Sequence, residues 1–338
     1  MHQVTEILDA YPVSDELLTL QRDEDHLFTK PRLGPIKLLE HENIAKVHFP
    51  VVYEPSKFAR PMGVYASNFL RIEWQKMNFR QPFYHRNADV DEMSYQVYGS
   101  QTLMTELGSV DLAPGDFTRI PVGIAHNNDG REEVHLLFYV PASVLECGLP
   151  DRTAKYSIPP FRGWVANNVA EVLTNCLGGP ECDISASMNA EELLLKHEEN
   201  LKDSDMIQVL RARDDSEGTT WMYKARHVWI GLTKSRGTTT SNKAATRSSR
   251  VYHRHRACEE IQCQIRGSRT LVSQRGNIDL LPGDFTSIPV GVAFTQVVTS
   301  GGESEHVTVL THLSAPRVAP VGVEATETTL EFVKQLCE

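Results

Sequence analysis

The residues best suited to chemistry in this sequence are two histidines, a glutamate and an asparagine from one stretch of the chain. His85 and Asn87 are two positions apart on a predicted strand, so their side chains face the same side. Glu92 opens the next predicted strand, and His126 follows a Pro-Gly-Asp turn at 114–116. Two imidazoles and one carboxylate form the facial triad that holds Fe(II) and leaves coordination positions open. We therefore predict a catalytic metal site of His85, Glu92 and His126, to which Asn87 could add an amide oxygen.

The segment that carries this set occurs twice. GSVDLAPGDFTRIPVGIAHNN at 108–128 returns 168 positions later as GNIDLLPGDFTSIPVGVAFTQ at 276–296. The second copy supplies His253, His255 and Glu260, but Phe294 stands where the first copy has His126. Because phenylalanine cannot coordinate a metal, we predict that the second set is a degenerate site. A metal in the second copy instead of the first is the alternative.

The elements that must position these residues are short strands. From 64 to 140, and again from 229 to 313, β-branched and aromatic residues alternate with polar ones between Gly, Pro and Asn breaks. This pattern predicts an all-β chain with a small barrel or sandwich in each half. Residues 1–145 are predicted as the first barrel with an N-terminal extension that contains a short helix over 5–20. Residues 146–220 are predicted as a connector with a helix over 188–203, and 221–338 as the second barrel with a terminal helix.

The spacing of the candidate ligands resembles the two motifs of the cupin superfamily. The first motif, G…H-x-H/N-x(3,4)-E…G, is matched by His85, Asn87, Glu92 and Gly99. The second motif, G-x(5)-P-x-G-x(2)-H, is matched by Gly115, Pro121, Gly123 and His126. The resemblance covers about 64–140 and 229–313, and it implies a bicupin. Its fold would be all-β, with two cupin (double-stranded β-helix, jelly-roll) barrels and a partly helical connector.

Within bicupins, the segments around 84–87 and 250–267 resemble those of the ring-cleaving dioxygenases of the homogentisate type. This resemblance implies Fe(II) as the cofactor, with O2 and a small phenolic compound as substrates. The length and acidity of the chain are similar to those of the large subunit of two-subunit hydroquinone dioxygenases, which implies a smaller partner subunit. A homo-oligomer is the alternative, because open barrel edges commonly pack against a second copy.

We accordingly predict an Fe(II)-dependent dioxygenase that cleaves a small aromatic ring. The same donors would also bind Mn(II), Ni(II), Co(II) or Zn(II). Gln96, Trp74 and His135 are candidates for the substrate cavity. Two other functions use the same pattern: a metal-dependent isomerase, decarboxylase or lyase, and a non-catalytic bicupin that serves as a partner subunit.

The net charge and the cysteine content of the chain limit the classes of partner and the compartment that we expect for it. The net charge of −10 over 338 residues argues against binding to nucleic acid or to a membrane surface, since both require basic patches. No basic segment followed by an apolar stretch opens the sequence, and its six cysteines have neither disulfide nor zinc spacing. We therefore expect a reduced, cytoplasmic protein.

Overall fold

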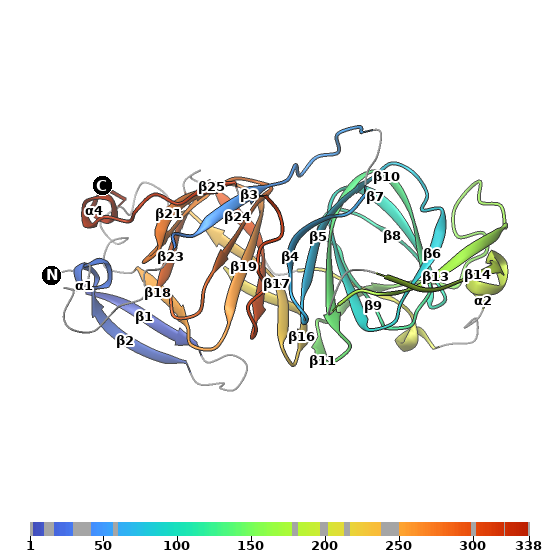
Figure 1. The fold of residues 1–338 in the computed structure, drawn as a ribbon, viewed down its shortest axis with the longest axis horizontal. Coiled ribbons are helices and arrows are strands. Elements are labelled where there is room, and N and C mark those ends of the chain that lie inside the picture. The colour runs from blue at the N-terminus through green and yellow to red at the C-terminus, as the bar shows by residue number, and fades with distance from the viewer. Residues whose placement is uncertain are drawn as a thin grey trace.

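The chain forms two β-barrels that lie side by side along the long axis of the molecule (Figure 1). The computed structural model describes residues 3–9, 17–29, 42–56, 60–177, 182–196, 202–212, 217–237, 250–298, 302–320 and 322–336. The predicted all-β fold class with two barrels is confirmed by the strands and their order within each sheet.

The first barrel is one 11-stranded sheet that curls on itself. Its strands are β4 (Met62–Ala66), β5 (Arg71–Met77), β6 (Phe83–Asn87), β7 (Val90–Thr105), β8 (Gly108–Leu112), β9 (Phe117–Ile120), β10 (His126–Pro141), β12 (Pro150–Thr153), β13 (Asn168–Asn175), β14 (Cys182–Ala190) and β15 (Gln208–Leu210). The strands β7 and β10 are 16 residues long and pair along both halves, so they line two faces of the barrel. β7 turns at Gly99, whose φ of 64° favours glycine.

The second barrel is built from a six-stranded and an eight-stranded sheet. The six-stranded sheet contains β1 (Gln3–Asp9), β2 (Leu18–Asp23), β18 (Val251–His255), β20 (Arg269–Ser273), β21 (Gly276–Leu280) and β23 (Phe294–Val298). The eight-stranded sheet contains β3 (Ala45–His48), β11 (Val144–Cys147), β16 (Gly218–Ala225), β17 (Val228–Arg236), β19 (Glu259–Arg266), β22 (Asp284–Ile288), β24 (Glu303–Thr311) and β25 (Val323–Glu324).

Helices are short in the described part of the chain. They are α1 (Glu24–Phe28), α2 (Glu191–Lys196), the 3-10 turn η1 (Asp203–Asp205) and α4 (Leu330–Gln335). The helix predicted over 188–203 is confirmed only over α2, because residues 188–190 belong to β14 and Asp203 to η1, while 197–201 lie outside the described residues. The predicted terminal helix is confirmed as α4, whose N-terminal Thr329 side chain accepts a hydrogen bond from the Phe332 amide. The helix predicted over 5–20 is wrong, because β1 and β2 occupy its described residues.

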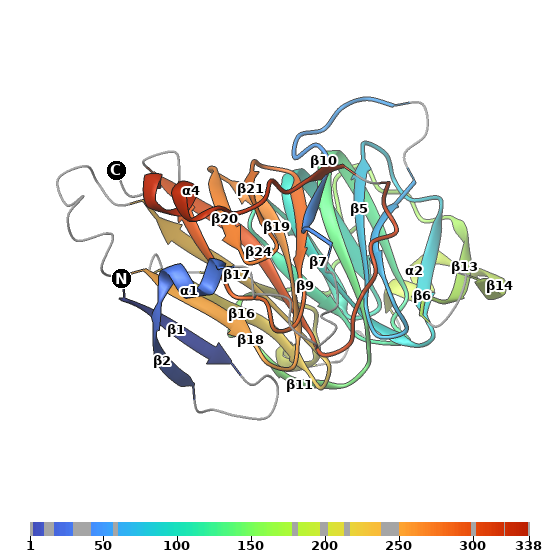
Figure 2. The same ribbon diagram turned by 60° about the vertical axis from the view of Figure 1, so that its left-hand side comes forward.

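The predicted division of the chain at residue 145 differs from the observed strand pairing. β1 pairs in parallel with β18 (Figure 2), and β3 pairs with β22, so β1 and β3 complete the second barrel instead of extending the first. In the same way β13, from the predicted connector, pairs in parallel with β6 and completes the first barrel. The reason lies in sheet physics: an open barrel edge needs a pairing strand, and sequence does not reveal which distant strand supplies it.

The two added segments are equivalent to each other. The Tyr252 hydroxyl donates a hydrogen bond to Glu24 in α1, at 2.8 Å, and the Tyr84 hydroxyl donates one to Glu191 in α2, at 2.9 Å. In each barrel the exchanged strand and helix therefore attach to the same tyrosine of the repeat.

The barrels are held together by a shared apolar core. Leu136 and Phe138, on the outer face of β10, pack in one buried cluster with Ile230 and Val309 of the second barrel. Because strand side chains alternate, Leu137 and Tyr139 face the interior of the first barrel instead. This alternation decides which residues of the first barrel can take part in a site.

Candidate metal centre

Three strands of the first barrel bring the predicted ligands together. His126 on β10 is the direct cross-strand partner of His85 on β6, and their rings lie 5.4 Å apart between centroids. Glu92, on β7, places its Oε2 atom 3.3 Å from the Nε2 atom of His126. One ligand atom from each residue lies within 4.8 Å of the others, and Glu92 and His126 are buried. Two ligands at about 2.1 Å from one ion are about 3 Å apart, so this spacing fits a shared metal ion.

The ring of His126 is already oriented for coordination. Its Nδ1 atom donates a hydrogen bond to the carbonyl oxygen of Ile124 at 3.1 Å. A carbonyl can only accept, so in the neutral ring the proton sits on Nδ1 and the lone pair sits on Nε2. The Nε2 atom is the one that faces Glu92, so the ring offers its lone pair to the centre of the cluster.

The ionisation of the cluster also suits a cation. Burial raises the pKa of Glu92, but His126, His85 and the Asn87 amide outweigh this effect and lower it to about 2. Burial and the nearby His126 lower the pKa of His85 to about 4, so this imidazole is neutral at pH 7. Burial lowers the pKa of His126, but the interaction with Glu92 outweighs burial, and the pKa is raised overall. A proton on His126 therefore competes with a metal ion.

Asn87 supports the cluster in a different way from the one predicted. Its amide nitrogen donates a hydrogen bond to Glu92 Oε2 at 2.9 Å, and its amide oxygen accepts one from the Cys176 thiol at 3.2 Å. The amide oxygen is therefore engaged with the thiol, and the amide nitrogen orients the carboxylate. Sequence reasoning missed Cys176, because β13 reaches this barrel from the predicted connector.

The second barrel holds the equivalent residues in another arrangement. His255 Nε2 lies 2.5 Å from Glu260 Oε2, and its Nδ1 lies 3.4 Å from Asp9 Oδ2, a contact too poorly aligned for a hydrogen bond. Burial lowers the pKa of His255, but the interactions with Cys258 and Glu260 outweigh it and raise the pKa to about 10. A ring protonated on both nitrogens has no lone pair for a metal.

Phe294 fills the place that His126 has in the first barrel. Its ring lies 6.0 Å from His253 and 5.7 Å from His255 between centroids. Among the residues that the structure describes, the second barrel has no group of three ligand atoms as close as that of the first. This arrangement agrees with the degenerate second site that the sequence predicts. Asp9 was not predicted, since it arrives on the exchanged strand β1.

The three predicted cavity residues lie in two different places. Gln96 and His135 are buried cross-strand partners inside the first barrel, and Glu133 accepts hydrogen bonds from both, at 3.0 and 2.7 Å. They are four residues from the Glu92–Tyr139 pair, which is about 13 Å along the strands. Trp74 points the other way: its Nε1 atom donates a hydrogen bond to the Pro50 carbonyl at 2.9 Å, within the core between the barrels. The cavity prediction for Trp74 is wrong, because the alternation on β5 places it on the outer face.

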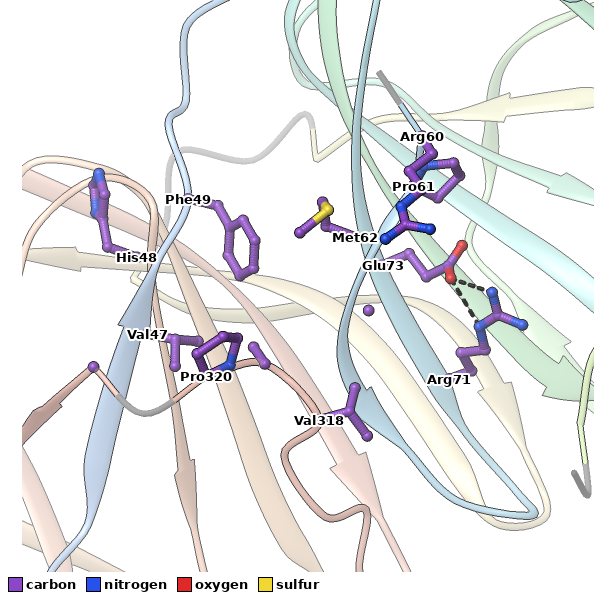
Figure 3. Close-up of a pocket in the computed structure, with 13 residues that line it drawn as sticks. Val47, His48, Phe49, Arg60, Pro61, Met62, Arg71, Glu73, Val318 and Pro320 are labelled. Atoms are coloured by element: carbon purple, nitrogen blue, oxygen red, sulfur yellow. Dashed lines mark hydrogen bonds and ion pairs between the residues drawn. The ribbon is translucent and has the colours of Figure 1, made fainter. Parts of the chain in front are cut away.

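A cavity of about 820 Å³ lies between the two barrels, with β4 and β5 of the first on one side and β3 of the second on the other (Figure 3). Its described walls are mainly apolar, with Val47, Phe49, Met62 and Val318 among them. The charged residues Arg60, Arg71 and Glu73 and the imidazole of His48 also line it. The cavity therefore combines apolar walls with a cationic excess.

Comparison with known proteins adds only distant similarities. No family model matches the chain, and no curated protein matches it. A cupin 2 conserved barrel domain protein from Leptotrichia buccalis aligns over 81% of this chain and 100% of its own, at 9% identity and a TM-score of 0.47. A mutant of Bacillus subtilis oxalate decarboxylase aligns over 83% of this chain and 80% of its own, at 14% identity and a TM-score of 0.47. Another oxalate decarboxylase structure aligns over 83% and 81%, at 15% identity and a TM-score of 0.49. These values are too low to support a conclusion about activity.

No helix in the described part of the chain is long and apolar enough to cross a membrane. The described cysteines include Cys147, Cys176, Cys258 and Cys263 as free thiols.

Proposed function

We propose that the first barrel binds one divalent metal ion through His85, Glu92 and His126 and that the protein is a metal-dependent enzyme. The observation that carries this proposal is the buried group of two imidazoles and one carboxylate, whose ligand atoms lie within 4.8 Å of one another. Such a set binds one face of the ion and leaves the other positions for substrates.

We further propose Fe(II) as the metal and a small phenolic compound and O2 as the substrates, with cleavage of the ring as the reaction. A bound Fe(II) ion, held by His85, Glu92 and His126, would supply electron transfer between the phenolic substrate and O2. The residues of the chain hold and orient the ligands: Asn87 and Ile124 fix Glu92 and His126 through the hydrogen bonds described above. Burial of Glu92 and His126 keeps water from the ligand side of the centre.

A metal-dependent decarboxylase, isomerase or lyase is the second candidate, because the same three ligands serve these reactions and function depends on the rest of the pocket. Oxygen consumption separates the two candidates. A dioxygenase consumes one O2 for each substrate molecule, whereas the other reactions consume none.

The experiment that tests the proposal is metal analysis of anaerobically purified wild type beside His126→Ala and His253→Ala. We expect one equivalent of iron per chain in wild type and in His253→Ala, and none in His126→Ala. Iron lost only from His253→Ala would move the site to the second barrel. Iron absent from all three proteins would contradict a metal-dependent enzyme and favour a binding module.

A further inference from the structure

The two barrels provide a comparison within one chain. Residues that both barrels share serve the fold that they have in common. Arg86 donates to Glu171 and to the Gly123 carbonyl, and Arg254 does the same with Glu6 and the Gly291 carbonyl. Residues present only in the barrel with the complete ligand set are candidates for its function.

One row of side chains keeps its glutamate in both barrels but differs at its other two positions. In the first barrel, Tyr139 on β10 pairs with Glu92 on one side and with Arg71 of β5 on the other. The corresponding row of the second barrel is Trp229, Leu310 and Glu260. Cross-strand partners face the same side, so Arg71 and Tyr139 face the interior with Glu92.

The next row likewise loses its charged residue. Glu73 and Leu137 are partners in the first barrel, and Gly231 and Thr308 are partners in the second. Trp229 and Leu310 instead form an apolar cluster with Cys258 and Trp221. The barrel that lacks the histidine ligand therefore also lacks the arginine, the tyrosine and the second glutamate of this wall.

The side chain of Arg71 is held in place on two sides. Its Nε atom donates a hydrogen bond to Glu73 at 2.8 Å, and its Nη2 atom donates to the same carboxylate oxygen (Figure 3). Its guanidinium carbon lies 5.3 Å from the centre of the Tyr139 ring, which is a cation–π contact. A guanidinium fixed in this way loses little freedom when it binds a further oxygen.

The same arginine borders both the interior of the barrel and the cavity. Arg71 and Glu73 line the cavity of about 820 Å³, together with Arg60 and apolar side chains. Adjacent strands are about 4.8 Å apart, so the backbones of Arg71 and Glu92 are about 10 Å apart across Tyr139. The Arg71 side chain and the Glu92 carboxylate therefore extend into the same interior space of the barrel.

We propose that Arg71 binds an anionic oxygen of the substrate, a carboxylate or a phenolate, while the substrate lies beside the metal ligands of the first barrel. This inference rests on the proposed function of that site and adds the charge of the ligand. The ligand class is a small organic anion with an apolar or aromatic body. Arg71 contacts the substrate, whereas Glu73 and Tyr139 position the guanidinium.

Charge at the site agrees with an anion. With a divalent ion on Glu92 and the pair of Arg71 and Glu73 nearby, the immediate site carries one net positive charge. Of the charged residues described around the cavity, two are arginines and one is a glutamate. An anionic ligand neutralises this charge, whereas a cationic ligand would add to it.

The test uses the full chain loaded with Mn(II), which suits the same donors and gives an electron paramagnetic resonance signal. Two probes that differ by one carboxylate, hydroquinone and 2,5-dihydroxybenzoate, are titrated into wild type and Arg71→Gln. We expect Mn(II) to bind both proteins equally, because Arg71 is not a ligand. We expect Arg71→Gln to bind at least one probe about tenfold more weakly or worse, the usual effect of losing a hydrogen bond to a charged group. Arg71→Lys should retain part of the affinity.

The two probes separate the two sources of the anion. If only 2,5-dihydroxybenzoate binds more weakly, Arg71 binds a carboxylate; if both weaken equally, it binds a phenolate. The control is Arg119→Gln, which removes an arginine on the outer face of the same barrel, in an ion pair with Asp91 at 2.9 Å. This variant should bind both probes as wild type does.

The outcomes that overturn the inference are distinct from those that overturn the proposed function. Unchanged affinity of Arg71→Gln for both probes, or wild type that binds Mn(II) but neither probe, would overturn the role of Arg71. Wild type that binds no Mn(II) would overturn the proposed function itself. If Arg71→Gln does not fold because Glu73 is left unpaired, Arg71→Gln/Glu73→Gln removes both charges and should show the same loss of affinity.

Discussion

Replacing Phe294 by histidine is expected to leave the second barrel without a tight metal site, whereas Phe294→His combined with His255→Asn creates one. Phe294→His restores the missing imidazole opposite His253. The remaining obstacle is His255, whose Nε2 atom lies 2.5 Å from Glu260 Oε2 and occupies the carboxylate that the metal needs. Asparagine is the residue at the same position of the first barrel, where it donates to Glu92 without blocking the cluster.

The difference in metal affinity between the single and the double variant follows from the hydrogen bond between His255 and Glu260. A hydrogen bond to a charged group contributes about 1.5–3 kcal/mol, which corresponds to a factor of about 10 to 150 in affinity. The metal must displace this hydrogen bond in the single variant but not in the double variant. The second equivalent of metal should therefore bind the single variant about 10 to 150 times more weakly than the double variant. Repulsion between the imidazolium of His255 and the cation acts in the same direction.

The assay is an anaerobic titration with Mn(II), in which the signal of free Mn(II) is followed by electron paramagnetic resonance. Wild type should bind one equivalent, and the double variant two. His126→Phe, which gives the first barrel the residue of the second, should bind none. A single variant that binds its second Mn(II) as tightly as the double variant would refute the reasoning, because the His255–Glu260 contact would then not obstruct coordination.

Three further results are expected. Asp116→Ala, which removes the partner of Arg152 and Arg211, should lower the free energy of unfolding in urea by about 2–3 kcal/mol. The loss is smaller than for a fully buried ion pair because the two arginines are about a third exposed. A loss below about 1 kcal/mol would contradict this expectation. The pKa of His255 is raised from 6.5 to about 10, so the stabilisation of the folded state by its protonated ring is complete below pH 6.5 and is lost as the pH rises to 10. The difference in the free energy of unfolding between wild type and His255→Asn should therefore shrink over that range. A constant difference would count against the pairing of His255 with Glu260. Trp74→Ala should cost about 3–5 kcal/mol of stability without loss of Mn(II), and loss of the metal would place Trp74 in the site after all.

The ligand cluster could be predicted from the sequence because its information is local. His85, Asn87 and Glu92 lie on two strands joined by a tight turn, and His126 follows the repeated turn at 114–116. Alternation along strands then decides which side each residue faces. The duplication made the loss at Phe294 visible, since each position of one copy has a counterpart in the other.

The parts that could not be predicted depend on contacts between distant segments. Asp9 reaches the second barrel on β1, and Cys176 reaches the first on β13, because each repeat lends its first strands to the other barrel. Trp74 was assigned to the wrong face, since the polar residues Arg71, Glu73 and Gln75 of β5 face the barrel interior and Trp74 faces the apolar core between the barrels, the reverse of the usual pattern. Arg71 gave no signal at all: its pairing with Tyr139 depends on the register between β5 and β10.

Because β1 and β3 pair with strands of the second barrel, removing them tests whether the observed or the predicted division of the chain is correct. If residues 1–48 extended the first barrel, their removal would damage the metal site. In the structure the two strands β1 and β3 from this segment complete the second barrel: Lys46 forms an ion pair with Asp284 at 2.7 Å, and Glu6 accepts a hydrogen bond from Arg254 at 2.6 Å.

A chain that begins at Phe49 is therefore expected to keep one equivalent of Mn(II) while it loses amide protection in β18 and β22, as hydrogen exchange would show. Removing β3 exposes the edge of β22, and removing β1 exposes that of β18, whereas every strand that carries a ligand of the first barrel keeps its partners. The matched variant Lys46→Ala, which removes the side-chain contacts of Lys46 with Asp279 and Asp284 but no strand, should lower protection in β22 and not in β18. Loss of Mn(II) with protected β18 and β22 would instead assign the first 48 residues to the first barrel.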